Sequence, residues 1–97
     1  MEKHNLNLTT PKLLEYAAKA LMLVELEGNW PRYCNSHVNV TAKGTITVVF
    51  KGCGRYYESA SVRIGDFPKY QIFTEKLLTK LNKVTGKNYT EKDLNIY

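Results

Sequence analysis

Two short stretches of alternating apolar and polar residues, joined by a glycine-containing turn, constrain the fold of this chain most. Val38 and Val40 alternate with polar residues before the turn, and Ile46 and Val48 do so after it. The loop 42–44, Ala-Lys-Gly, fits a three-residue hairpin connection with glycine in the left-handed position. This loop length pairs Val38 with Val48, so that both apolar rows lie on one face. The pattern therefore predicts an antiparallel hairpin that turns one face toward a core.

Apolar residues at helical spacing lie on both sides of the strand region. Thr10-Pro11 marks the start of a first helix, with threonine as N-cap and proline at the first helical position, and Gly28 is its expected stop. A second helix is expected to begin at the N-cap Asp66 and to end at Gly86. The apolar faces consist of Leu13, Leu14, Ala17, Ala18, Leu21 and Val24 in the first helix and of Tyr70, Phe73, Leu77, Leu81 and Val84 in the second. Each helix therefore has one face to bury.

A third strand pattern follows a second glycine-containing turn at 52–54. Its apolar row consists of Tyr56, Ala60, Val62 and Ile64. Glu58 interrupts this row, and a buried carboxylate needs a partner. Glu58 therefore indicates a sheet edge or a bulge.

The order of these patterns predicts a single α+β domain over residues 1–97, with 1–8 as either a loose tail or a short docked segment. We expect the arrangement α-β-β-β-α, in which two helices pack on one face of a three-stranded antiparallel sheet. Residues 90–93 resemble a capping box and predict a short C-terminal helical turn. The open face of the sheet is expected to present His37, Asn39, Thr41, Thr45, Thr47, Val49, Lys51, Tyr57, Ser59, Ser61 and Arg63.

The charge balance of the chain favours an anionic partner. Fourteen lysines and arginines against nine aspartates and glutamates give a formal net charge of +5. The excess lies in the sheet region and the second helix, because residues 11–27 hold two lysines against three glutamates. The first residues lack a basic and apolar signal segment, and the longest apolar run is too short to cross a bilayer. We therefore expect a cytoplasmic protein with no membrane partner, in which the two cysteines are reduced.

The lysines of the second helix form a stripe. Lys69, Lys76, Lys80 and Lys83 fall within an arc of roughly 60° on a helix. Such a stripe can track phosphates, or it can be a solvated helix edge whose lysine stems cover apolar side chains. With Lys51 of the open sheet face, these four lysines are the candidate anion- or nucleic-acid-binding residues.

A second candidate surface combines aromatic and arginine side chains, the residue types that dominate protein–protein hot spots. Most of them lie in the loop 29–36 before the first strand or directly after the turn 52–54, and both loops lie at the same end of the predicted hairpin. The alternative is partial burial of tyrosine rings with hydrated hydroxyl groups. The candidate partner-binding residues are Trp30, Arg32, Tyr33, Arg55, Tyr56, Tyr57 and Arg63.

The chain contains no recognisable catalytic or cofactor motif. Cys34, His37 and Cys53 offer three ligands, whereas a structural zinc site needs four, so two unrelated thiols and a surface histidine are the preferred interpretation. An enzyme using Cys53 would need a base and a setting that stabilises the thiolate. We expect no enzymatic activity, no metal and no cofactor.

The order helix, three strands, helix is similar to that of double-stranded-RNA-binding domains. Those domains carry a Pro/His-containing loop between the first two strands and a tight lysine cluster at the start of the last helix. Here that loop is 41–44, Thr-Ala-Lys-Gly, and the lysines are spread along the helix. The likeness is one of topology, and no site is carried over.

Two functions follow from these patterns. The favoured one is a non-enzymatic interaction protein that docks on a protein partner or a nucleoprotein complex, because small single-domain proteins rich in Lys, Asn and Tyr are typical of phage or mobile-element inhibitors. The alternative is a module that binds nucleic acid directly through the lysine stripe and the open sheet face. An exposed edge of a three-stranded sheet also allows a homodimer.

Overall fold

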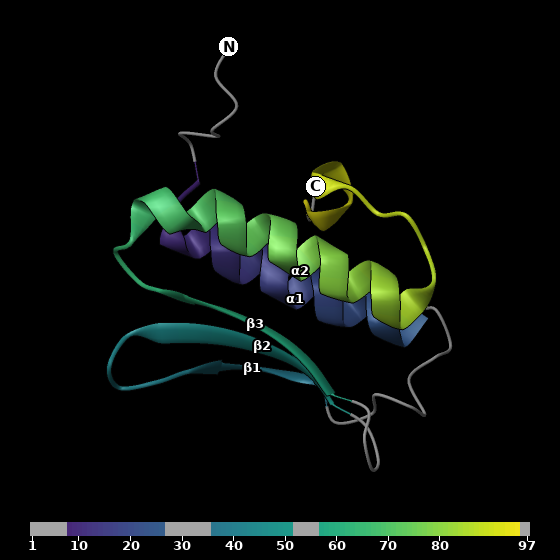
Figure 1. The fold of residues 1–97 in the computed structure, drawn as a ribbon, viewed down its shortest axis with the longest axis horizontal. Helices are drawn as coiled ribbons and strands as arrows, with labels where there is room; N and C mark the ends of the chain where they lie inside the picture. The colour runs from purple at the N-terminus through teal and green to yellow at the C-terminus, as the bar shows by residue number, and fades with distance from the viewer. Residues whose placement is uncertain (1–7, 27–35, 52–56, 96–97) are drawn as a thin grey trace.

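The computed structural model describes residues 8–26, 36–51 and 57–95. Its two long helices, α1 (Thr10–Leu26) and α2 (Tyr70–Thr85), lie side by side over one face of a sheet, so that the molecule has two layers (Figure 1). The predicted α+β fold of the order α-β-β-β-α is confirmed.

The sheet consists of β1 (His37–Val40), β2 (Thr45–Lys51) and β3 (Tyr57–Arg63), antiparallel and in the order β1-β2-β3. Val38 pairs with Val48, which is the register predicted from the turn length. Because β2 lies in the middle, β1 and β3 are both edge strands, and the prediction that Glu58 lies at a sheet edge is confirmed.

One apolar cluster joins the inner face of the sheet to both helices. Buried side chains of β2 and β3 meet buried side chains of α1 and α2, and Leu8 before α1 is buried in the same cluster. The cluster consists of Leu8, Leu13, Tyr16, Ala17, Ala20, Leu23, Val24, Ile46, Val48, Phe50, Ala60, Val62, Tyr70, Phe73, Leu77, Leu81, Val84 and Leu94. The outer face of the sheet is less exposed to solvent than predicted, because Val49 is only 6% exposed. Its place on the middle strand explains this difference, since the pairing puts His37 and Ser59 on either side of it.

The start of α1 lies one residue earlier than predicted. The Lys12 backbone N–H donates to Thr9 Oγ1 (3.3 Å), and the Leu13 N–H donates to the Thr9 carbonyl (3.0 Å). Thr9 therefore acts as the N-cap in place of Thr10. The Thr10 hydroxyl is hydrogen-bonded to the Tyr70 hydroxyl on α2 (2.8 Å) and joins the two helices.

The start of the second helix also differs from the prediction. A 3₁₀ turn, η1 (Phe67–Lys69), precedes α2, and the Asp66 side chain makes no capping hydrogen bond. An Asp at this position would accept from the N–H two or three residues ahead. Pro68 has no N–H, and the Lys69 N–H already donates to the Asp66 carbonyl (2.9 Å). The helix ends as predicted at Gly86, whose φ is +74°.

The C-terminal turn η2 (Glu91–Leu94) forms as the capping-box pattern predicted. The Thr90 backbone N–H donates to Asp93 Oδ2 (2.9 Å). Leu94 is fully buried, so this short element is docked on the helical layer.

Candidate functional site

The lysine stripe of α2 is divided by an internal ion-pair network. Lys80 Nζ lies 3.0 Å from Glu58 Oε1, and Lys83 Nζ lies 2.7 Å from Glu58 Oε2. The Glu58 side chain is 13% exposed and projects from β3 toward α2. Hydrogen bonds from Lys83 and Lys80 lower the pKa of Glu58 below its ordinary value, although burial opposes this shift. One carboxylate thus neutralises part of the charge of two stripe lysines.

A groove of about 440 Å³ lies between the edge strand β3 and the first half of α2. One wall is formed by three consecutive residues, 61–63, near the end of β3. The other wall is one helical face, since its residues are spaced by three, one and three positions. The lining residues are Thr45, Ser61, Val62, Arg63, Asp66, Lys69, Ile72, Phe73 and Lys76. This set is called the basic groove below.

The basic groove combines positive charge with apolar surface. Arg63, Lys69 and Lys76 are all exposed and face a single carboxylate, that of Asp66. None of the ion pairs between described residues involves these three cations. Ile72 on α2, between Lys69 of η1 and Lys76, is 55% exposed. The groove is therefore suited to an anionic ligand that also carries apolar surface.

The structure divides the predicted anion-binding residues into three places. Lys69 and Lys76 line the basic groove, whereas Lys80 and Lys83 contact Glu58. Lys51 lies elsewhere, at the end of β2, where it pairs in register with Tyr57.

Two of the predicted partner-binding residues are described, and they lie at opposite ends of β3. Arg63 lines the basic groove, while Tyr57 is exposed at the start of the strand. The other predicted residues lie outside the described parts of the chain: Trp30, Arg32, Tyr33, Arg55 and Tyr56.

The sites weighed for metal binding or catalysis receive no further support. Cys34 and Cys53 lie outside the described residues, and His37 is exposed on β1. Within 8–26, 36–51 and 57–95, no three His, Cys, Asp or Glu side chains are grouped in a way that could hold a metal ion. In the same ranges, none of the helices has the length and apolar character needed to cross a membrane.

Sequence reasoning missed Ile72 and Asp66 as residues of this site. Ile72 was detectable, because it is a large apolar residue outside the helical face formed by Tyr70, Phe73 and Leu77. Asp66 was interpreted only as a helix cap, and the failure of that cap leaves its side chain at the groove.

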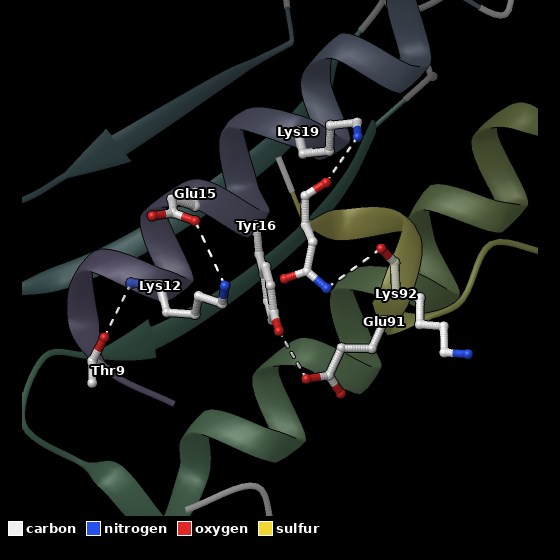
Figure 2. A network of polar contacts seen from close by, with 8 residues as sticks. Thr9, Lys12, Glu15, Tyr16, Lys19, Glu91 and Lys92 are labelled. Atoms are coloured by element: carbon white, nitrogen blue, oxygen red, sulfur yellow. Dashed lines mark hydrogen bonds and ion pairs between the residues drawn. The ribbon is translucent and has the colours of Figure 1, made fainter. Parts of the chain in front are cut away.

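A second polar cluster joins α1 to η2 (Figure 2). The Tyr16 hydroxyl donates to Glu91 Oε2 (2.9 Å), and Lys19 Nζ donates to the Asn95 carbonyl (3.0 Å). Burial, together with the hydrogen bond to Glu91, raises the pKa of Tyr16 to about 12. The cluster fixes the C-terminal turn on the helix, so we assign it to the architecture of the molecule.

Comparison of the chain with protein-family models, with curated proteins and with solved structures finds no match. The charge and apolar surface of the basic groove are therefore the main indication of function.

Proposed function

We propose that the protein is a non-enzymatic interaction protein whose basic groove docks on an acidic surface of another protein. One observation carries the proposal: Arg63, Lys69 and Lys76 surround a groove that also contains exposed apolar surface. Protein interfaces combine apolar contact at the centre with charged groups at the rim, and this groove offers both.

The ion pairs of Glu58 favour a protein ligand over a nucleic acid at this site. A phosphate backbone is best tracked by a continuous row of cations, each of which adds salt-dependent affinity. Here the row is interrupted after Lys76, because Lys80 and Lys83 share the Glu58 carboxylate. That carboxylate would also repel a phosphate chain that continued along α2.

Charge reversal in the groove tests the proposal. We expect the double variant Lys69→Glu and Lys76→Glu to lower the affinity for a fluorescent polyglutamate peptide at least about tenfold, because two attractive contacts become repulsive. The double variant Lys51→Glu and Lys92→Glu carries the same net charge and leaves the groove intact, so it should bind nearly as the wild type does. Fluorescence anisotropy at several salt concentrations measures both.

The same titration with single-stranded RNA and duplex DNA distinguishes the proposed function from the alternative, which is direct binding of nucleic acid. If either nucleic acid binds more tightly than polyglutamate at every salt concentration, or if the peptide does not bind, the proposed function is wrong. A loss of peptide binding that is equal in the two double variants would also contradict it, because only one of them changes the groove.

Direct binding of nucleic acid has one observation in its favour, at the far end of the open face of the sheet from the groove. Tyr57 is 57% exposed and pairs in register with the exposed Lys51, so an aromatic ring and a cation lie side by side on that face. Such a pair can stack on a base and contact its phosphate. This alternative predicts that Lys51→Glu weakens binding of single-stranded RNA while reversal of Lys69 and Lys76 does not.

A further inference from the structure

We propose that the basic groove binds its partner as an added β-strand, in which an extended acidic segment of another protein pairs with the free edge of β3. The inference rests on the proposed function and adds to it the mode of binding and the kind of segment. Addition of a strand uses main-chain hydrogen bonds for affinity and alternate side chains for specificity.

The hydrogen-bond pattern of the sheet shows which backbone groups of β3 are available. The Ile64 N–H donates to the Gly44 carbonyl (2.6 Å), so the residue pair 64 and 44 is of the hydrogen-bonded kind. Hydrogen-bonded and non-hydrogen-bonded pairs alternate along an antiparallel ladder. Ser61 and Ser59 therefore belong to non-hydrogen-bonded pairs, with Thr47 and Val49, and their N–H and C=O groups point away from β2.

These outward groups have no partner in the described parts of the chain. No hydrogen bond between described residues reaches the backbone of Ser59 or Ser61, whereas the Arg63 carbonyl accepts from the Asp66 N–H (3.1 Å). Ser61 also lines the basic groove. A ligand lying in the groove can thus reach the edge of β3, and the turn at Asp66 limits how far a paired strand can extend in that direction.

The wall formed by α2 indicates the sequence pattern of the segment. Lys69 and Lys76 are separated by about 10 Å along the helix axis, and Ile72 lies between them. Alternate residues of a strand lie about 7 Å apart on one side, so three alternate side chains span about 13 Å. A segment with carboxylates at the first and fifth positions and an apolar residue at the third places its charges near the lysines and its apolar side chain near Ile72.

A second copy of this chain does not fit the same edge. Pairing of two β3 strands would bring the Arg63, Lys69 and Lys76 side chains of one copy toward those of the other, and like charges in a shared interface are repulsive. An acidic strand is attracted to this edge instead, because each of its carboxylates faces a cation.

A proline at the edge of β3 tests the inference. Ser61→Pro removes one outward N–H, and proline is tolerated on an edge strand when its N–H side faces solvent. The probe is a fluorescent peptide with the alternating sequence Glu-Thr-Val-Thr-Glu between flexible ends. We expect Ser61→Pro to bind it about tenfold more weakly than the matched variant Ser61→Ala, which loses the same hydroxyl group but retains the backbone N–H.

A change in the peptide provides a test that does not depend on the folding of the proline variant. The same peptide with N-methyl groups on the amides of one edge keeps its side chains but cannot pair along that edge. Two such peptides are compared, each methylated along a different edge. Because only one edge of the peptide can pair with β3, one of the two should bind about tenfold more weakly than the unmodified peptide. Amide hydrogen exchange of Ser59 and Ser61 should also slow when the unmodified peptide binds.

The outcomes separate this inference from the proposed function. If charge reversal at Lys69 and Lys76 abolishes peptide binding but Ser61→Pro and both N-methylated peptides bind as their unmodified counterparts do, the groove binds acidic segments without strand pairing and the inference is wrong. If the wild type self-associates through β3 in sedimentation experiments, with Ser61→Pro restoring the monomer, a second copy occupies the edge and the inference is also wrong.

Discussion

Glu58 determines how the positive charge of α2 is distributed. Its two oxygens bind Lys80 and Lys83, and the two lysines nearer the start of the helix are left beside the groove. A carboxylate in the apolar row of an edge strand is tolerated because the helix packed above it supplies two cations. The same residue therefore stabilises the packing of α2 on β3 and limits the length of the cationic surface.

Replacement of this carboxylate should change how stability depends on pH. At neutral pH we expect Glu58→Gln to lower the free energy of unfolding by about 1 kcal/mol, because two charge-assisted hydrogen bonds become weaker. The folded-state pKa of Glu58 is lowered from 4.5. Its contribution is therefore fully present above pH 4.5 and is lost as the pH falls through the folded pKa. The free energies of unfolding of wild type and variant should therefore converge as the pH falls. Urea unfolding of both proteins between neutral and acidic pH measures this.

Glu75→Gln is the control for this measurement. Glu75 is exposed on the same helix and takes part in none of the ion pairs that the structure describes. Its replacement should leave the pH dependence of stability unchanged. A difference between wild type and Glu58→Gln that stays constant down to pH 3 would contradict the role assigned to Glu58.

The buried hydroxyl of Tyr16 makes a second prediction, at alkaline pH. Its pKa is raised from 10.0 to about 12 in the folded protein, which means that folding favours the neutral phenol. The stability gained in this way is complete below pH 10 and is lost as the pH rises through 12. Tyr16→Phe removes the hydrogen bond to Glu91 and should cost about 1 kcal/mol at neutral pH.

The loss of stability between pH 10 and pH 12 should be smaller in Tyr16→Phe than in the wild type when thermal unfolding is followed by circular dichroism. Tyr57→Phe is the matched control, because the Tyr57 side chain is exposed. The interpretation fails if both variants show the alkaline transition of the wild type unchanged.

Among the elements, η2 shows how a very short segment is held in place. Its four residues dock through one buried side chain, Leu94, and through the hydrogen bonds that Tyr16 and Lys19 make to Glu91 and Asn95 (Figure 2). A 3₁₀ turn of this length has no stability of its own, so its order depends on these contacts.

Shortening the Leu94 side chain should therefore destabilise the whole domain. Leu94→Ala removes a fully buried side chain of the apolar cluster, and such changes cost about 2–5 kcal/mol. Lys92→Ala, in the same turn but exposed, should change stability by less than about 0.5 kcal/mol. Urea denaturation of the two variants measures the difference, and equal midpoints would show that η2 is not part of the cooperative unit.

The elements that sequence reasoning predicted correctly are those governed by local rules. The register of β1 and β2 followed from the length of one turn and the alternation of the valines beside it, and Gly86 ended α2 because a left-handed residue closes a helix. The cap at Asp66 was wrong for an equally local reason, since Pro68 removes the N–H that the side chain would have bound.

At the scale of the whole molecule, the features that escaped prediction depend on how the two layers are placed. The spacing of the lysines on α2 was visible in the sequence, but nothing local shows that Lys80 and Lys83 lie over Glu58 while Lys69 and Lys76 lie over the end of β3. That division requires the position of the helix over the sheet (Figure 1). The burial of Val49 depends in the same way on strand order, which places β2 in the middle.

The walls of the basic groove come almost entirely from one short stretch of chain, 61–76, to which only Thr45 is added from elsewhere. Within that stretch, Val62, Tyr70 and Phe73 belong to the apolar cluster, and most of the residues between them are exposed. Substitutions at the exposed positions of this segment would therefore change the charge and the apolar surface of the groove while the interior stays intact.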